Sequence, residues 1–139
     1  MYLFDTNVIS EIRKGSRTNF GVKNFFQQIQ ADEIEIFLSV ITIGELRRGI
    51  EIIRHRGDTQ QAQLLENWFD QIVGQYFNHI LEINTDICQL WGKIRVPNPH
   101  HALDKLIAAT AIVYDLTVVT RNTKDFAGSG VKLLNPFED

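Results

Sequence analysis

The stretch ALDKLIAATAIVYDLTVVT, residues 102–120, decides the fold of this chain of 139 residues. Its first part, residues 102–115, places apolar residues around most of a helical circumference and includes Ala108, Ala109 and Ala111, which predicts a buried helix packed closely on its neighbours. Its second part, Leu116–Thr120, is rich in β-branched residues and predicts a short strand. A helix that leads directly into a strand is typical of α/β proteins with a parallel sheet.

The rest of the chain repeats this alternation of helix and strand. Four further apolar runs predict strands at Tyr2–Phe4, Glu35–Ser39, His79–Ile83 and Val131–Leu134. Apolar residues recur at helical spacing over residues 22–29, 43–53, 64–73 and 87–94. We therefore expect one α/β domain over residues 1–139, with a mostly parallel sheet of about five short strands.

The composition fits a globular domain and leaves the function open. No apolar run approaches the roughly 20 residues that span a bilayer, and the N-terminal segment lacks the features of a signal peptide. Cys88 is the only cysteine, which suits a reducing cytoplasm. The net charge of −3 argues weakly against nucleic-acid binding, unless several acids are gathered to hold cations. The positions of the acids therefore decide the question.

Four acidic residues map to one edge of the predicted sheet. Asp5 ends the first strand, and Asp125 follows the fourth. Asp104 begins the helix that leads back to the fourth strand, and Glu45 lies in the first turns of the helix after the second strand. Ligands of open parallel sheets bind at the carboxyl ends of the strands, where these positions meet. Converging carboxylates repel one another unless a cation neutralises them, and Mg²⁺ or Mn²⁺ prefers such oxygen ligands.

Each acid also has an ordinary structural explanation. Asp5 could cap the following helix, and an acid such as Asp104 in a first helical turn interacts favourably with the helix dipole. Glu45 could be a solvated helix residue, and Asp125 could be another cap. These explanations account poorly for Asp104 at the head of a helix that is apolar nearly all round, because an unpaired carboxylate there is costly. Together, the four acids predict a site for a hard divalent metal.

Other chemistries lack the residues that they need. A phosphatase of the haloacid dehalogenase type would place a second Asp two residues after Asp5, where Asn7 stands. A dinucleotide-binding enzyme would need a glycine-rich turn after the first strand, and the sequence has none there. The pair His100 and His101 suggests zinc, but the chain has neither an HExxH motif nor a cysteine partner, and a loop that enters the helix explains both histidines.

Four segments resemble the motifs of PIN domains, in the same order along the chain. They are LFDTNVISE (3–11), SVITIGELRRG (39–49), DKLIAATA (104–111) and LTVVTRNTKDF (116–126), and the tail LNPF (134–137) fits as well. No one motif decides, but the four together cover essentially the whole chain and are similar to toxins of the VapC and FitB type. The resemblance implies a PIN-like α/β/α sandwich and a metal-dependent endoribonuclease. Its acidic quartet would be Asp5, Glu45, Asp104 and Asp125.

The resemblance also implies a reaction and a set of partners. RNA would be cut with Mg²⁺ or Mn²⁺ to leave a 5′-phosphate and a 3′-hydroxyl, with a metal-activated water as the attacking group because metal-binding acids are poor nucleophiles. The partners would be a second copy of the chain, a cognate antitoxin and, in the larger assembly, operator DNA.

Two alternatives to the toxin compete. A housekeeping RNA-processing nuclease differs from a toxin only in its neighbouring gene. A PIN-like binding module that works with a DNA-binding partner without cutting would have lost metal acids, and all four candidates remain in this sequence.

Polar and basic residues accompany the acids. The polar residues Thr6, Asn7, Thr120 and Asn122 could orient ligands or waters, or could equally be capping and turn residues. Lys105 departs from the family, which often has a small residue beside the third acid, and we expect it to contact the RNA backbone together with Arg121 and Lys124. The fourth acid is the least defined, since Asn122 lies near Asp125 and some relatives carry an acid there.

Overall fold

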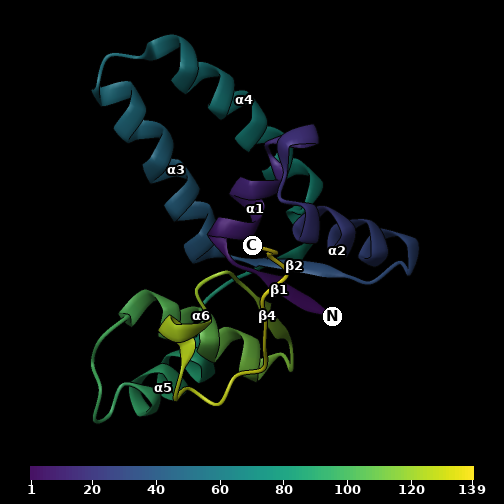
Figure 1. Cartoon of the computed structure of the whole chain (residues 1–139). Helices are drawn as coiled ribbons and strands as arrows, with labels where there is room; N and C mark the ends of the chain where they lie inside the picture. The colour runs from purple at the N-terminus through teal and green to yellow at the C-terminus, as the bar shows by residue number, and fades with distance from the viewer.

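The computed structural model describes all residues 1–139 and contains a five-stranded sheet with helices on both faces (Figure 1). The strands are β1 (Tyr2–Phe4), β2 (Ile36–Ser39), β3 (Ile80–Leu81), β4 (Thr117–Val119) and β5 (Leu133–Leu134). Their spatial order is β3-β2-β1-β4-β5, and every neighbouring pair is parallel. The predicted α/β sandwich with a mostly parallel sheet of about five strands is confirmed.

Six helices surround the sheet. They are α1 (Thr6–Ile12), α2 (Phe20–Ala31), α3 (Val40–His55), α4 (Thr59–Gln75), α5 (Thr85–Ile94) and α6 (Ala102–Val113). Helices α2 to α5 each begin at a side chain that accepts a hydrogen bond from a first-turn amide; these residues are Asn19, Ser39, Asp58 and Asn84. No helix combines the length and the apolar character needed to cross a membrane.

The sheet separates two apolar cores. Consecutive residues of a strand point to opposite faces, so Phe4 and Val119 join the core beneath α1 to α4, and Leu3 and Val118 join the core beneath α6. Members of the second core are Leu3, Ile107, Ala108, Ala111, Leu116, Val118 and Phe126. Burial on both faces explains why the central strands read as continuous apolar runs in the sequence.

Several strands are shorter than the apolar runs predict. The run Leu116–Thr120 forms a strand only over Thr117–Val119, because the Leu116 amide donates instead to the Ala111 carbonyl at the end of α6. The run His79–Ile83 retains only Ile80–Leu81, since Phe77–His79 forms a 3₁₀ turn. An apolar run indicates that side chains are buried, whereas a strand also needs backbone hydrogen bonds to a neighbouring strand. Apolar runs are therefore longer than the strands that they contain.

Helix α6 is buried around its whole circumference over residues 107–111 but is exposed at both ends. Ile107, Ala108 and Ala111 are fully buried, but Leu103 and Val113 are 53% and 41% exposed. The prediction of a helix enclosed nearly all round is therefore wrong at its two ends. As a consequence, Asp104 in the first turn is half-buried and open to solvent on one side.

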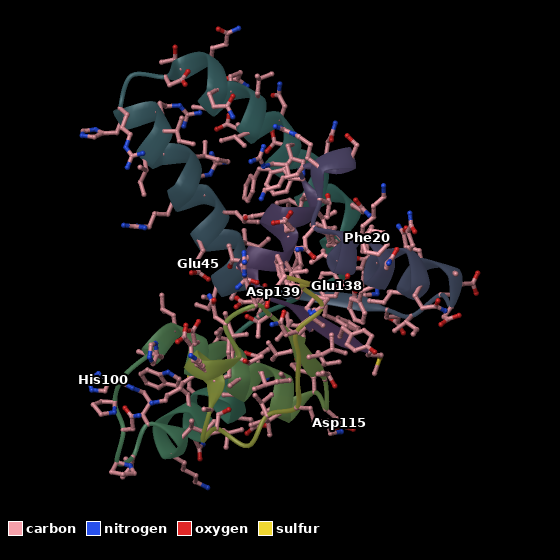
Figure 2. All side chains as sticks on the ribbon, viewed as in Figure 1. Phe20, Glu45, His100, Asp115, Glu138 and Asp139 are labelled. Carbon is pink, nitrogen blue, oxygen red and sulfur yellow. The ribbon has the colours of Figure 1, made fainter.

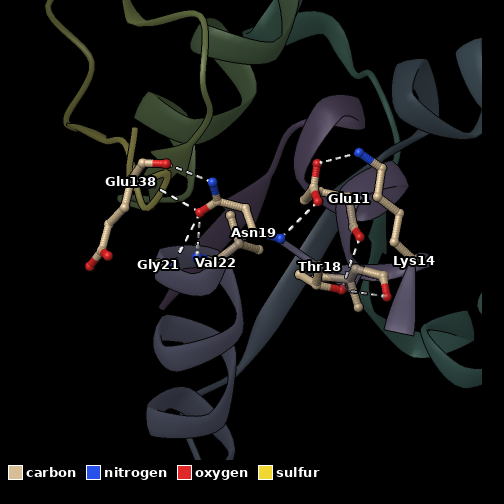
Figure 3. A network of polar contacts seen from close by, with 8 residues as sticks. Glu11, Lys14, Thr18, Asn19, Gly21, Val22 and Glu138 are labelled. Atoms are coloured by element: carbon tan, nitrogen blue, oxygen red, sulfur yellow. Dashed lines mark hydrogen bonds and ion pairs between the residues drawn. The ribbon is translucent and has the colours of Figure 1, made fainter. Parts of the chain in front are cut away.

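A polar network fastens the C-terminal tail to the start of α2 (Figure 3). Asn19 Oδ1 accepts hydrogen bonds from the amides of Gly21, Val22 and Glu138, and Asn19 Nδ2 donates to the Glu138 carbonyl at 2.7 Å. The tail lies so close to the helix that a Cβ atom at Gly21 would be 2.2 Å from the Pro136 carbonyl oxygen. A glycine is therefore required where α2 meets the tail.

The same network holds the buried carboxylate of Glu11 (Figure 3). Glu11 Oε2 accepts a hydrogen bond from the backbone N–H of Asn19 at 2.9 Å, and Glu11 Oε1 accepts one from the Lys14 ammonium at 2.9 Å. Burial disfavours the charged form, but these two donors outweigh it and hold the pKa of Glu11 below its usual value. Glu11 is thus a carboxylate whose charge is satisfied within the chain.

Candidate functional site

All four predicted acids lie where the strands present their carboxyl ends. Asp5 follows β1 directly, and Glu45 lies in the second turn of α3, at the end of that helix nearest the sheet (Figure 2). Asp104 lies in the first turn of α6, and Asp125 lies in a 3₁₀ turn, Thr123–Phe126, that follows β4. The negative charges of the other three acids all act on Asp104, so the four form one electrostatic cluster.

Three hydrogen bonds fix the carboxylate of Asp5, which is 5% exposed. Asp5 Oδ1 accepts the Thr6 amide at 2.8 Å and so caps α1. Asp5 Oδ2 accepts the Thr120 hydroxyl at 2.9 Å and Asn7 Nδ2 at 3.2 Å. The capping explanation therefore holds for Asp5 Oδ1, and the role of Asp5 in a metal site stays a prediction.

Thr6 connects the first and second acids. Its hydroxyl donates to Glu45 Oε1 at 2.8 Å, across 39 positions of sequence. Burial and the charge of Asp5 raise the pKa of Glu45, against the effect of this hydrogen bond. Thr6 therefore positions a carboxylate and is more than a residue of the first helical turn.

Asn7 and Thr120 join the end of β1 to the end of β4. Asn7 Nδ2 donates to Thr120 Oγ1 at 3.2 Å as well as to Asp5, and Asn7 Oδ1 accepts the Arg121 amide at 3.0 Å. Thr120 Oγ1 also accepts the backbone amide of Asn122 at 3.0 Å. Asn122 takes part through its backbone alone, and its side chain makes no hydrogen bond.

The electrostatics of the cluster disfavour negative charge. Burial raises the pKa of Asp104 to about 6, helped by the charges of Asp5, Asp125 and Glu45 and opposed by His101. Burial also raises the pKa of Asp5, although the hydrogen bonds of its neighbours oppose the shift. A divalent cation would reverse both effects, and carboxylate oxygens are the ligands that Mg²⁺ and Mn²⁺ prefer. The residues present therefore fit a hard metal.

The structure places one further residue, His101, beside the acids, although the sequence indicated only a loop there. His101 Nδ1 lies 3.8 Å from Asp104 Oδ2, and His101 Nε2 lies 3.7 Å from Asp125 Oδ1. The available signal was the spacing of three residues between His101 and Asp104, which brings side chains to one side of a helix start. The approach to Asp125 depends on tertiary structure and left no signal in the sequence.

The three basic residues expected to meet RNA have different environments. Arg121 and Lys124 are exposed, and the guanidinium carbon of Arg121 lies 4.9 Å from the centre of the Phe137 ring. Lys105 is only 4% exposed, and its Nζ donates to the Asn98 carbonyl. The structure thus corrects the role expected for Lys105: it is buried near the start of α6 and holds the preceding loop.

This site lies within the part of the chain that a known family matches. The match to the PIN domain covers residues 2–128. The chain belongs to the PIN domain family. This PIN domain is 31% identical over 144 residues to the toxin FitB of Neisseria gonorrhoeae, with 100% of both chains covered. It is 30% identical over 142 residues to the VapC ribonuclease Y4jK of Sinorhizobium fredii, with 99% of both chains covered.

Solved structures extend the likeness to three dimensions. The crystal structure of FitAcB from Neisseria gonorrhoeae matches this PIN domain with a TM-score of 0.84 and 31% identity, over 98% of both chains. The structure of FitAB bound to an IR36 DNA fragment matches with a TM-score of 0.83 and 28% identity, over 100% of this chain and 97% of that one. The resemblance to VapC and FitB toxins inferred from four motifs is confirmed.

Proposed function

We propose that this PIN domain is a divalent-metal-dependent endoribonuclease that acts as the toxin of a type II toxin–antitoxin pair. The observation that carries the proposal is the convergence of four carboxylates from four separate segments, whose charges add to the effect of burial in raising the pKa of Asp104 to about 6. A cluster of this kind is unfavourable without a cation. Relatives similar over their whole length are named as a toxin and as a ribonuclease, which supports both halves of the proposal.

Asp5 and Asp104 would form the core of the metal site, and Glu45 and Asp125 would complete it. Mg²⁺ or Mn²⁺, when bound, supplies a water of lowered pKa and stabilises negative charge that develops on phosphate oxygens. Asp125 is the fourth acid of the proposal, since it acts electrostatically on both Asp5 and Asp104. Asn122 is exposed and its side chain has no partner in the cluster.

Neighbouring residues hold the acids in the arrangement that the proposal needs. The donors Thr120 and Asn7 fix Asp5 Oδ2, and the Thr6 hydroxyl fixes Glu45 Oε1. Because these donors come from the ends of β1 and β4, the acids need little reorganisation when a ligand binds. The exposed Arg121 and Lys124 follow β4 and would neutralise RNA phosphates beside the acids.

The partners we infer are a second copy of the chain, a cognate antitoxin and, in the larger assembly, operator DNA. The similarity to FitB in FitAcB, and in FitAB bound to DNA, supports them. A nuclease of RNA acting in the cytoplasm would harm its own cell unless it were restrained, which is the physical need that an antitoxin meets.

The nuclease half is tested on a panel of RNAs with Mg²⁺, Mn²⁺ or a chelator, using wild type and Asp5→Asn. We expect cleavage only with metal, and loss of cleavage in the variant. Metal should also raise the melting temperature of wild type more than that of Asp5→Asn, because binding stabilises the native state by mass action. Asp70→Asn, an exposed acid on α4, is the matched control and should behave as wild type. Cleavage in the presence of chelator, or equal melting shifts in wild type and Asp5→Asn, would contradict the assignment.

The toxin half needs a separate test. The chain is expressed alone and together with its upstream neighbour, and growth, complex formation and RNase activity are measured. We expect growth arrest by the chain alone and rescue by a bound neighbour. A chain that is harmless, active when purified and bound by no neighbouring product would instead be a housekeeping nuclease.

A further inference from the structure

The loop before α6 brings an imidazole ring against two of the acids. Each ring nitrogen of His101 faces a different carboxylate, with Nδ1 3.8 Å from Asp104 and Nε2 3.7 Å from Asp125. Both separations exceed a hydrogen bond, so neither nitrogen is engaged by these contacts. One ligand atom from each of the three residues lies within 4.8 Å of the other two.

The position of His101 is fixed by the residues around it. Lys105 is buried and donates to the Asn98 carbonyl, and Trp91 Nε1 donates to the Ala102 carbonyl at 2.8 Å, so both ends of the loop are held. His101 itself has a φ of +56°, and its side chain does not cap α6. The backbone at His101 is therefore held, and the ring lies beside the two acids without a hydrogen bond of its own.

We propose that His101 is a metal ligand in this chain and that, with Asp104 and Asp125, it makes this side of the site bind a transition-metal ion such as Mn²⁺ or Zn²⁺ in preference to Mg²⁺. The inference rests on the proposed function, because it adds a ligand to the same site.

The geometry and the chemistry of the three residues support this assignment. An imidazole binds an ion through one nitrogen, and two ligands that share an ion at about 2.1 Å lie roughly 3 to 4 Å apart. The separation of 3.7 Å from Nε2 to Asp125 and that of 3.8 Å from Nδ1 to Asp104 each fall in this range, so either nitrogen could share an ion with one carboxylate. The third ligand atom then lies within 4.8 Å and needs a small movement of the exposed side chains to reach the same ion. Imidazole nitrogen binds transition metals well, whereas Mg²⁺ selects oxygen.

The ordinary explanation is a surface ion pair between a histidine and two acids. Such pairs contribute little, and the His101 side chain is 51% exposed. The two explanations predict different behaviour: an ion pair would be displaced by any cation that binds the acids, whereas a ligand would place a nitrogen atom on the ion and would discriminate between metals. A measurement that reports on the ion itself therefore separates them.

The experiment measures metal binding by the purified full-length chain. Calorimetry gives the affinity for Mn²⁺ and Mg²⁺, and electron spin echo envelope modulation detects a nitrogen nucleus bound to Mn²⁺. We expect a nitrogen signal and tighter binding of Mn²⁺ in wild type. His101→Asn should lose the signal and weaken Mn²⁺ binding by about 10- to 100-fold, with Mg²⁺ binding nearly unchanged. The matched control is His100→Asn, which alters the adjacent exposed histidine and should keep both properties.

The variants are chosen so that misfolding cannot mimic the result. Asn and Gly both tolerate a positive φ, so His101→Asn and His101→Gly should keep the circular dichroism and the melting behaviour of wild type. Equal Mn²⁺ affinity and an unchanged nitrogen signal in both His101 variants would overturn the proposal. Failure of the proposed function looks different: wild type would bind Mn²⁺ through His101 and yet cleave no RNA.

Discussion

Two sets of buried or half-buried carboxylates in this molecule, Glu11 and the four acids that include Asp104, have opposite electrostatics. Glu11 accepts hydrogen bonds from the Asn19 amide and the Lys14 ammonium, and its pKa lies below the usual value despite burial. Burial, together with the charges of three other acids, raises the pKa of Asp104 to about 6. The first carboxylate has its counter-charge within the chain and stabilises the fold. The second has only a half-exposed histidine nearby and is left for a cation from outside.

Asp104→Asn is expected to have the largest effect on RNA cleavage and so to distinguish the acids of the site most clearly from Glu11. Loss of a metal ligand should reduce metal-dependent RNA cleavage by at least about 100-fold, since even residues that only support ligands are worth about 10- to 100-fold. The free energy of unfolding without metal should stay the same or rise, because repulsion among the acids is relieved. Cleavage assays and urea unfolding check the two statements. Undiminished cleavage by a folded variant would remove Asp104 from the site.

The pH dependence of stability should distinguish the same two sets in metal-free protein. Asp104 has a raised pKa in the folded state, so native protein binds more protons than unfolded protein between about pH 4 and 6, and stability from this group is lost as pH rises through that window. We expect wild type to lose about 1 to 2 kcal/mol from this group between about pH 4.5 and 7.5. Urea unfolding of wild type and Asp104→Asn at both pH values measures it. If both proteins showed the same change, the carboxylate would not be perturbed.

Glu11 should show the opposite sign. Its folded pKa is lowered, so its contribution is present above the pKa of the unfolded chain and is lost as pH falls. The contributions of Glu11 and Asp104 to the free energy of unfolding must therefore be compared at the same pH.

A smaller effect is expected from Asn7→Ala, which removes the amide that joins Asp5, Thr120 and the Arg121 backbone. The acids remain but are less well held, so we expect about a 10-fold loss of cleavage with weaker metal binding. Ser10→Ala, on the same helix, is the control. Equal activity in the two variants would assign Asn7 to the fold alone.

The smallest effect is expected from Glu11→Gln, which tests the set that is satisfied within the chain. Loss of the charged acceptor of Asn19 and Lys14 should lower the free energy of unfolding by about 1 kcal/mol and leave cleavage unchanged. Glu82→Gln, at an exposed position, should change neither quantity. A loss of cleavage in folded Glu11→Gln would show that the two sets are coupled.

The sequence was sufficient for the order of elements and for the four acids. Alternating apolar runs and helical stripes are local patterns, and they located all five strands and the main helices within a few residues. The sequence alone groups the acids because the carboxyl ends of parallel strands share one edge of a sheet, which follows from topology. The family motifs around Asp5, Glu45, Asp104 and Asp125 added the same grouping independently.

Other features were decided only by the tertiary structure. The burial of Lys105 depended on how the loop before α6 packs against the helix, because its Nζ donates to the Asn98 carbonyl in that loop. A lysine beside an acid is predicted to be exposed until that packing is known. The approach of His101 to Asp125 joins residues from a loop and from a turn, whose conformations have no hydrophobic period to predict them. Periodic patterns report which residues are buried in regular elements, whereas contacts between irregular segments arise only when the packed elements bring those segments together.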